Sequence, residues 1–468
     1  MKEYSLVIIG GGAGAFAAAT KANDLKQKTV IINAGLPIGG TCVNVGCVPS
    51  KHLLEVGSQY YYGQRPRFDS IKMGGKPEFD FKKAIVQKDE VVGSLRMSNY
   101  TDVVASFKTV EYIEGKAKFV SKDEIKVNGE KIRGEKFVIA TGSEAKMPPI
   151  SGIDKIKYLT NVEALQLDHL PESMIVLGGG PLGLEFAQMF HHLGTKITVV
   201  ERMERILPFE EPEISVELRR ALEEEGISIH TSAEVKKVRK ENGCKVVAVK
   251  VEGHEVEFKS EEILVAAGIT PKTKDMGLEK ANVETDARGF IKTDAEMRTT
   301  SENIWAAGDS VGKLALETVA AKEGAIAAEN ALTGSHKKIG YDEIPHAVFT
   351  TPQVASVGLT EEGLMRRMNV CACRTVMLSS VPKARATGEN QGVIKLVIDP
   401  HTKAIVGCHI VAPAASEMIH EAVMAVKHKV TIDDLIDTVH VFPTFSEGIK
   451  LAAQAFVRDI RVMSCCIG

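Results

Sequence analysis

The sequence predicts an α/β fold with two Rossmann-like domains and a C-terminal α+β domain, and three observations support this. An apolar strand, a glycine turn and a helix occur together twice along the chain. Two short apolar segments that end in small residues lie between and after these units, and from about residue 340 strands precede helices. With 468 residues, the chain is long enough for two to four domains of about 100 to 200 residues each.

The first unit is "YSLVIIGGGAGAFAAATKA", and a second apolar strand, "KTVIIN", follows it and ends at Asn33. Gly10, Gly12 and Ala15 form a G-x-G-x-x-A motif. Such a turn lets backbone N–H groups and a helix N-terminus approach a pyrophosphate, and the residue ending the next strand can reach a ribose hydroxyl. An acid is usual there, whereas the Asn33 amide accepts hydrogen bonds at one end alone. The motif therefore predicts a dinucleotide site but leaves its affinity for ribose open.

The second unit, "SMIVLGGGPLGLEFAQMFHHLG" followed by "KITVVE", repeats this plan. Gly178, Gly180 and Gly183 form G-x-G-x-x-G, and Glu201 lies at the same offset from its first glycine as Asn33 does from Gly10. One glycine motif alone is a weak signal, because a plain turn can share it. Two copies in register, each flanked by strands and a helix, favour two dinucleotide-binding domains.

Between the two units lies "VIATGS", with Thr141 and Gly142, and after them lies "NIWAAGDS", with Gly308 and Asp309. Small residues at the end of a strand let a ligand or another backbone come close. Asp309 could accept a hydrogen bond from a cofactor hydroxyl, or it could cap the helix expected after Ser310. Taken alone, the cap is the simpler interpretation.

A pair of cysteines lies in "GGTCVNVGCVPSK", where Cys42 and Cys47 have C-x-x-x-x-C spacing and Lys51 follows one helical turn later. Helix-start N–H groups and a nearby cation lower a thiol pKa and favour the reactive thiolate. The alternative is a pair of buried cysteines that act as small apolar residues. The neighbouring glycines crowd the pair too closely for ordinary core packing, which favours the reactive interpretation.

Together these motifs resemble the FAD-dependent pyridine nucleotide disulfide oxidoreductases over essentially the whole chain. The resemblance implies an FAD-binding domain in two parts, 1–150 and 273–338, an inserted NAD(P)-binding domain at 151–272, and an interface (dimerisation) domain at 339–468. It also implies a homodimer in which the interface domain completes the active site of the other subunit.

The resemblance further implies FAD and either NADPH or NADH as cofactors. It makes Cys47 the thiolate that touches the flavin, Cys42 the thiol that meets substrate, and Lys51 and Glu185 an ion pair near the flavin N5. The expected FAD-binding residues are Gly10, Gly12, Ala15, Asn33, Gly40, Thr41, Lys51, Thr141, Gly142 and Asp309. The residues expected to bind the nicotinamide nucleotide are Gly178, Gly180, Gly183, Glu201 and Arg202.

The choice of nucleotide stays open. Glu201 would bind a free 2′-hydroxyl and favour NADH, whereas Arg202 and Arg205 could accept a 2′-phosphate and favour NADPH. We therefore expect both nucleotides to be used.

One departure from the family pattern concerns the acid/base. Disulfide reductases of the family have H-x-H-P-T-x-x-E, and this chain has "HVFPTFSE", with Phe442 in place of the second histidine. A phenyl ring cannot transfer protons, so cleavage of an organic disulfide should fall by roughly 10²- to 10⁴-fold. A substrate that requires thiolates and two electrons, but no proton donor for a leaving sulfur, fits better.

The C-terminal segment "SCCIG" contains a second cysteine pair, Cys465 and Cys466. Soft thiolates bind soft metal ions, and we extend that rule to Hg(II). We therefore expect this pair to capture Hg(II) as a thiol complex and pass it to Cys42 and Cys47 for reduction to Hg(0). The alternatives are a disulfide reductase, such as a thioredoxin reductase or dihydrolipoamide dehydrogenase, and a metal-sequestering protein without turnover.

Composition and charge exclude other classes. A net charge of −3 provides no basic field for nucleic acid, and no apolar run is long enough to span a bilayer. The N-terminus lacks a signal-peptide pattern, so we expect a cytoplasmic protein. Four further cysteines, with no site pattern, are expected in the core: Cys244, Cys371, Cys373 and Cys408.

Overall fold

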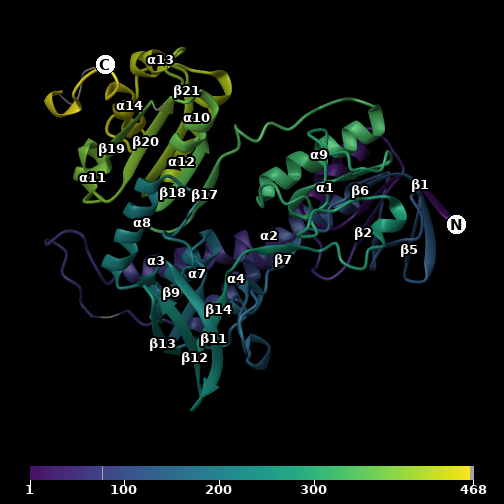
Figure 1. Ribbon diagram of the computed structural model, residues 1–468, viewed down its shortest axis with the longest axis horizontal. Coiled ribbons are helices and arrows are strands. Elements are labelled where there is room, and N and C mark those ends of the chain that lie inside the picture. Colours follow the sequence, from purple (N-terminus) through teal and green to yellow (C-terminus); the bar gives the residue numbers. More distant parts are fainter. Residues whose placement is uncertain (76, 371, 464–468) are drawn as a thin grey trace.

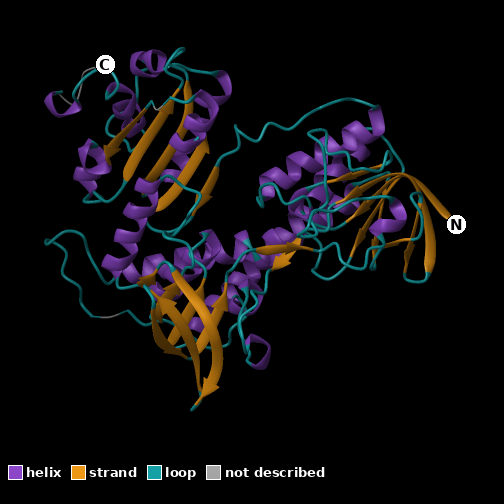
Figure 2. Ribbon diagram, in the orientation of Figure 1, coloured by secondary structure: helices purple, strands orange, loops and turns teal. Residues whose placement is uncertain are grey.

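The computed structural model describes residues 1–75, 77–370 and 372–463. Within these residues the strands form five sheets, and helices cover the larger ones (Figure 1, Figure 2). The α-helices are α1 (Ala13–Asp24), α2 (Gly40–Val45), α3 (Cys47–Tyr62), α4 (Phe81–Arg96), α5 (Asp102–Ser106), α6 (Asn161–Ala164), α7 (Pro181–Leu193), α8 (Pro212–Glu225), α9 (Glu317–Thr333), α10 (Glu361–Met368), α11 (Pro382–Thr387), α12 (Ala415–His428), α13 (Ile432–Asp437) and α14 (Glu447–Gln454). The short 3₁₀ or π turns are η1 (Met97–Thr101), η2 (Ile153–Lys155), η3 (Leu278–Ala281), η4 (Gly308–Ser310), η5 (Leu378–Ser380) and η6 (Ile460–Val462).

The strands follow the same numbering along the chain. They are β1 (Lys2–Ile9), β2 (Thr29–Asn33), β3 (Val110–Glu114), β4 (Lys118–Phe119), β5 (Glu124–Val127), β6 (Glu130–Ile139), β7 (Ser143–Ala145), β8 (Ser173–Leu177), β9 (Lys196–Val200), β10 (Ser228–His230), β11 (Ala233–Glu241), β12 (Cys244–Val251), β13 (His254–Ser260), β14 (Glu262–Val265), β15 (Ile269–Pro271), β16 (Ile304–Ala306), β17 (His346–Val348), β18 (Gln353–Gly358), β19 (Cys373–Met377), β20 (Val393–Ile398) and β21 (Ile405–Ala412).

The first sheet has the order β3-β2-β1-β6-β5-β4, and β16 also pairs with β6. Its central strands are parallel and apolar on both faces, as expected for a sheet covered on both sides. Leu6 and Ile8 of β1 pack on one face against α1 and α9, whereas Val7 and Ile9 pack on the other. This sheet contains the first dinucleotide unit.

Helices α1 and α9 lie side by side over that face, although a long stretch of chain separates them (Figure 1). They approach closely because glycines lie at the contact: a Cβ added at Gly324 would come within 2.0 Å of the Gly14 carbonyl oxygen. This close approach positions the first residue of α9 beside α2 and α3.

The second unit forms the parallel sheet β10-β9-β8-β14, with the antiparallel sheet β11-β12-β13 next to it. Its helix α7 begins at Pro181, which suits a first helical position, and is capped after Leu193 by Gly194, whose φ of +118° favours glycine. The chain reaches and leaves this part of the molecule at β7 and β15, which pair antiparallel with Ser143 opposite Pro271.

The C-terminal part is an antiparallel sheet in the order β17-β18-β21-β20-β19, covered by α12 and α14. These elements confirm the strands and helices predicted after residue 340. No helix in the described ranges is both long and apolar enough to cross a membrane.

Candidate active site

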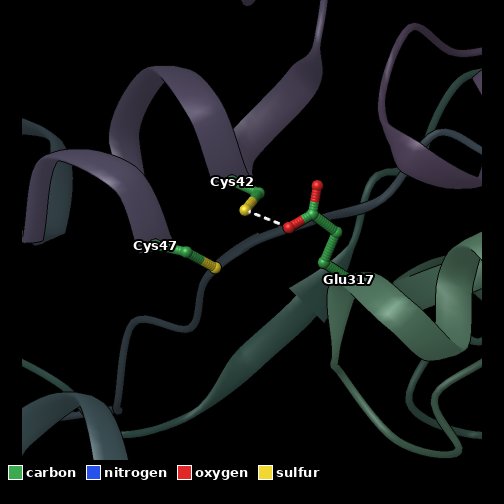
Figure 3. A group of neighbouring side chains, drawn as sticks. All are labelled: Cys42, Cys47 and Glu317. Atoms are coloured by element: carbon green, nitrogen blue, oxygen red, sulfur yellow. Dashed lines mark hydrogen bonds between the residues drawn. The ribbon is translucent and has the colours of Figure 1, made fainter. Parts of the chain in front are cut away.

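Three side chains from three helices point into one space: Cys42, Cys47 and Glu317 (Figure 3). Cys42 lies in α2, Cys47 is the first residue of α3, and Glu317 is the first residue of α9. One sulfur from each cysteine and one Glu317 carboxylate oxygen all lie within 4.8 Å of one another. Gly39, with a φ of +96°, precedes α2 and provides the left-handed turn that brings the cysteine segment to the glycine loop of α1.

The two thiols have opposite acidities. The pKa of Cys42 is raised by its hydrogen bond to Cys47, by burial, and by the negative charge of Glu317. The pKa of Cys47 is lowered, because the hydrogen bond from Cys42 and the charge of Lys51 outweigh burial. The pair therefore favours a thiolate at Cys47 and a thiol at Cys42, whose sulfur also lies within hydrogen-bond distance of Glu317 Oε2.

Lys51 and Glu185 form the ion pair that the resemblance implied, with 2.6 Å between Nζ and Oε2. Lys51 extends from α3 and Glu185 from α7, so the contact joins the first and second units. The other Glu185 oxygen accepts a hydrogen bond from the Phe349 backbone N–H at 2.9 Å. The Lys51 ammonium also lies 4.5 Å from the centre of the Phe349 ring, which stabilises the cation.

Sequence reasoning missed Glu317 and Tyr100. The Tyr100 hydroxyl donates a hydrogen bond to Glu317 Oε1 at 3.1 Å, and its ring packs edge-on against Phe16, 4.8 Å away. Glu317 is separated from Cys42 by 275 positions, so no local motif links the two. The contact becomes visible only in the fold, where Gly14 of α1 and Gly324 of α9 let the two helices approach closely.

The first glycine loop fits a dinucleotide such as FAD. A Cβ at Gly10 would collide with the Ala140 carbonyl oxygen at 2.1 Å, so this turn requires glycine, and Ala15 is fully buried. Gly40 approaches Gly12 so closely that an added Cβ would lie 2.6 Å from the Gly12 Cα. Thr41 follows Gly40 in α2, and Gly142 has open space around it within the described residues.

Polar groups around this loop also suit a bound cofactor. Thr141 Oγ1 is buried and has no hydrogen-bond partner among the described residues. The Asn33 amide donates to the Leu36 carbonyl and the Tyr112 hydroxyl, and so its oxygen is left as an acceptor beside Gly11. Asn33 can therefore still accept a ribose hydrogen bond.

Asp309 lies in η4 and accepts a hydrogen bond from the Ser143 hydroxyl at 2.6 Å. Burial raises its pKa, which the Ser143 hydrogen bond and the charge of Lys272 partly offset. The helix-cap alternative is wrong, because the carboxylate bonds to a side chain of another segment and the next α-helix begins later, at Glu317. This acceptor fits a cofactor hydroxyl.

The second loop repeats the geometry of the first. A Cβ added at Gly178 would lie 2.3 Å from the Ala266 carbonyl oxygen. A Cβ added at Gly183 would lie 2.1 Å from the Gly178 carbonyl oxygen. Gly180 precedes α7 and has open space in the described structure, which leaves room for a pyrophosphate.

Glu201 follows β9 and accepts hydrogen bonds from the Gly179 and Met203 N–H groups at 2.6 and 2.7 Å. These bonds hold the carboxylate at the place where a ribose is expected. Arg202 is exposed beside it. Arg205 instead directs its guanidinium to the carbonyl oxygens of Pro208 and Glu210, at 3.3 and 3.5 Å, and so is less available for a phosphate than the sequence indicated.

In the described segment around Phe442, both ionisable side chains, His440 and Glu447, already have hydrogen-bond partners. Phe442 is half exposed. His440 bonds to Glu421 at 2.7 Å and to the Thr438 carbonyl, and Glu447 accepts from the Thr444 backbone N–H. The described structure thus gives the neighbouring histidine a partner of its own.

Cys465 and Cys466 lie outside the described residues, as does Cys371. Of the cysteines expected in the core, Cys408 is fully buried, which confirms that prediction. The prediction is wrong for Cys244, which is exposed because it begins β12 at the hairpin with β11. Cys373 is partly buried.

The chain is similar to known proteins over nearly its whole length. Residues 4–324 match the family described as pyridine nucleotide-disulphide oxidoreductase, and residues 344–453 match its dimerisation domain. A mercuric reductase of Lysinibacillus sphaericus is 40% identical over 466 residues, covering 100% of this chain and 85% of that protein. A dihydrolipoyl dehydrogenase of Thermus scotoductus is 37% identical over 462 residues, 97% of this chain and 98% of that protein. The Cu(II) complex of a HOCl-induced flavoprotein disulfide reductase of Escherichia coli superposes with a TM-score of 0.86, at 28% identity, over 98% and 100% of the two chains.

Proposed function

Because this chain belongs to the pyridine nucleotide-disulphide oxidoreductase family, we propose that it reduces Hg(II) to Hg(0) with electrons from NAD(P)H through FAD. The observation that supports this most directly is the 40% identity to a mercuric reductase along the whole chain. The balance is simple: NAD(P)H loses a hydride, Hg(II) gains two electrons, and one proton is released. When bound, FAD supplies a two-electron relay between the nucleotide and the cysteine pair.

The cysteine pair binds the substrate. Cys47 offers a thiolate at the N-terminus of α3, and Cys42 offers a second sulfur within reach of the same ion. Two thiolates complete the coordination of Hg(II), so the cysteine pair can bind the ion by ligand exchange with a small-thiol complex. The Cys42 proton leaves with one of the displaced thiols.

Lys51 and Glu185 hold a positive charge beside the pair. Glu185 fixes the ammonium at 2.6 Å, and the Phe349 backbone fixes Glu185 in turn. This cation favours the thiolate of Cys47 and an electron-rich group next to it. Positioning the charge in advance avoids reorganisation during the reaction.

Phe442 distinguishes this reaction from disulfide reduction. Reduction of Hg(II) needs no proton donor for a leaving sulfur, and Phe442 supplies none. Both ring nitrogens of His440 are engaged, Nδ1 with the Thr438 carbonyl and Nε2 with Glu421, so neither is free to replace the missing base.

We further propose a homodimer that shares its active sites. Residues 344–453 match a dimerisation domain, and Val439 and Val441, next to Phe442, are 91% and 77% exposed in the single chain. Apolar side chains grouped in this way favour contact with another chain. The second subunit would bring Phe442 to the cysteine pair of the first.

Cys465 and Cys466 would collect Hg(II) and pass it to Cys42 and Cys47 by thiol exchange. We place the enzyme in the cytoplasm, because a reducing compartment keeps such dithiols free. This delivery role predicts that loss of the C-terminal pair matters most when free thiol is scarce.

The test is NADH and NADPH oxidation by the purified enzyme, with and without HgCl₂ and excess small thiol. We expect oxidation that requires Hg(II), yields volatile mercury and is lost in Cys42→Ser. The double variant Cys465→Ala/Cys466→Ala should slow at limiting thiol and recover at saturating thiol. Mercury binding without nucleotide oxidation would instead indicate sequestration, and brisk reduction of lipoamide or thioredoxin would indicate a disulfide reductase.

A further inference from the structure

Glu323 is a buried acid on α9 that has no part in the proposed reaction. It is 1% exposed, and each of its carboxylate oxygens accepts one hydrogen bond. The Gly308 backbone N–H donates to Oε2 at 2.6 Å, and the Tyr341 hydroxyl donates to Oε1 at 2.7 Å. Burial and the charge of Asp309 raise the pKa of Glu323, and the two hydrogen bonds lower it in part. Burying an acid is unfavourable, so a carboxyl retained in the interior with a donor on each oxygen indicates a specific role.

We propose that Glu323 is a positioning residue for FAD: it holds the turn that presents Asp309 to the cofactor. Through Tyr341 it also joins this turn to the segment that leads into the C-terminal sheet. The proposal concerns the cofactor site and is independent of the proposed substrate, Hg(II).

Two contacts fix Asp309 before a cofactor binds. Asp309 follows Gly308 in η4, so the bond from the Gly308 N–H to Glu323 fixes the backbone directly before it. From the other side, the Ser143 hydroxyl donates to the Asp309 carboxylate at 2.6 Å. A group held in its binding position in advance loses less freedom when the ligand arrives, which strengthens binding. Glu323 therefore contributes to FAD affinity through Asp309, with its own two oxygens already occupied.

Neighbouring residues of α9 contact two different parts of the expected FAD site. Glu323 bonds to η4, where a cofactor hydroxyl is expected, and Gly324 contacts Gly14 of α1. The glycine loop before α1 is where the pyrophosphate is expected, and α1 and α9 lie side by side (Figure 1). Loss of the Glu323 acceptor should release η4 and leave the contact between the two helices in place.

Tyr341 brings a third segment to this carboxylate. It lies between α9 and β17, in the stretch that connects the first sheet to the C-terminal sheet. Burial and the hydrogen bond to Glu323 raise the pKa of Tyr341, so the hydroxyl stays protonated and remains a donor. Tyr341→Phe should therefore weaken FAD binding by leaving one Glu323 oxygen buried without its donor.

The experiment measures the FAD dissociation constant of the full-length holoenzyme without substrate. The protein is diluted to equilibrium, and FAD in the ultrafiltrate is quantified by its fluorescence. Glu323→Leu should weaken FAD binding by roughly 10- to 100-fold, the effect of losing a hydrogen bond to a charged group. Glu323→Gln keeps an acceptor for the Gly308 N–H and should stay within about threefold of the parent.

Two further variants distinguish positioning from general stability. Asn330→Leu removes another buried polar group of α9, whose amide donates to the Glu296 and Lys337 carbonyls. It should lower the thermal unfolding midpoint and leave the FAD dissociation constant unchanged. In an Asp309→Asn background, Glu323→Leu should add less than it does in the parent, because both residues act on one contact.

An unchanged FAD dissociation constant in Glu323→Leu would overturn the proposal, as would an equal loss in Asn330→Leu. A full additional loss in the Asp309→Asn background would show that Glu323 does not act through Asp309, which also overturns it. If Glu323→Leu does not fold, Tyr341→Phe decides, with an expected loss of roughly 2- to 10-fold against none. No substrate is present, so none of these results depends on whether the enzyme reduces Hg(II).

Discussion

At the scale of single residues, Cys42 and Cys47 differ in how easily each loses its proton. Alkylation rates follow the thiolate fraction, and a free thiol has a pKa of about 8.5. Because the Cys47 pKa is lowered and the Cys42 pKa is raised, Cys47 in a Cys42→Ser variant should become reactive at a lower pH than Cys42 in a Cys47→Ser variant. Iodoacetamide labelling across pH, read by peptide mass spectrometry, measures both midpoints.

Lys51→Met in the Cys42→Ser background tests why the pKa of Cys47 is the lower of the two. Removing Lys51 takes away an attraction and exposes Cys47 to the unbalanced charge of Glu185, so the Cys47 midpoint should rise. If the two single-cysteine variants label at the same pH, the assignment of thiolate and thiol is wrong.

Substitution of Phe442 tests whether this residue determines the preference for a metal over a disulfide substrate. Phe442→His restores an acid/base at the position where the family has one, and disulfide reductase activity should rise by part of the roughly 10²- to 10⁴-fold that such a group supplies. Glutathione- and lipoamide-dependent nucleotide oxidation measures it. Val441→His puts the same ring on the neighbouring exposed residue and should bring no gain. An unchanged rate in Phe442→His would mean that Phe442 does not determine substrate class.

Sequence reasoning located the cysteine pair and its ion pair, but not their surroundings. Cys42, Cys47 and Lys51 occur within one short motif, so local spacing was enough. Glu185 followed from the family resemblance. Glu317 and Phe349 come from distant segments, and their contacts exist because α9 and the turn after β17 fold back onto α3 and α7. No local pattern could indicate those approaches.

At the scale of elements, the approach of α9 to α1 depends on Gly324. Alanine in place of glycine normally stabilises a helix by up to about 1 kcal/mol. Here the added Cβ would lie 2.0 Å from the Gly14 carbonyl oxygen, so Gly324→Ala should destabilise the protein, by about 1–3 kcal/mol as in overpacked cores. A lower midpoint of thermal unfolding measures this. Lys322→Ala, on the exposed side of α9, should leave the midpoint nearly unchanged.

The same variant tests how Glu317 is positioned. Because α9 must move away from α1, Glu317 should lie farther from Cys42, and the alkylation midpoint of Cys42 in the Cys47→Ser background should fall together with the unfolding midpoint. Stability lost without any change at the cysteine site would show that the start of α9 is held independently of the helix contact.

At the scale of the whole molecule, Lys395 joins the C-terminal sheet to the second dinucleotide unit. It lies in β20, is 1% exposed, and forms ion pairs with Glu211, Glu213 and Glu361 at 3.0, 2.9 and 2.7 Å. Removing one partner of a buried pair costs about 3–5 kcal/mol because the other charge is left unpaired. Lys395→Met should therefore lower the thermal midpoint strongly.

A second substitution makes this prediction specific. Glu211 is itself buried, and so Lys395→Met/Glu211→Met replaces the pair by apolar groups and should recover much of the loss. Lys427→Met, at an exposed position on α12, is the matched lysine control. Equal midpoints for Lys395→Met and the parent would show that the pair does not hold the two parts together.

The overall fold was largely predictable because its signals are local and repeated. Both glycine motifs lie between a strand and a helix, and the predicted C-terminal strands and helices are present. The small sheet β7-β15 and the Lys395 cluster were not predicted, because each forms between segments far apart in the sequence. The domain boundaries at 150, 272 and 338 stay predictions.

The antiparallel pairing of β7 and β15 has an evolutionary consequence. The chain enters the segment between β7 and β15 and leaves it at neighbouring points, because these two strands pair with each other. Recombination could therefore exchange that segment with little disturbance to the β7-β15 sheet. Glu185 lies within that segment, however, and its partners Lys51 and Phe349 lie outside it. A transplanted segment lacking an acid at this position would preserve nucleotide binding and leave Lys51 without its partner. A transplanted segment should therefore restore the Lys51 contact only if it brings an acid at this position.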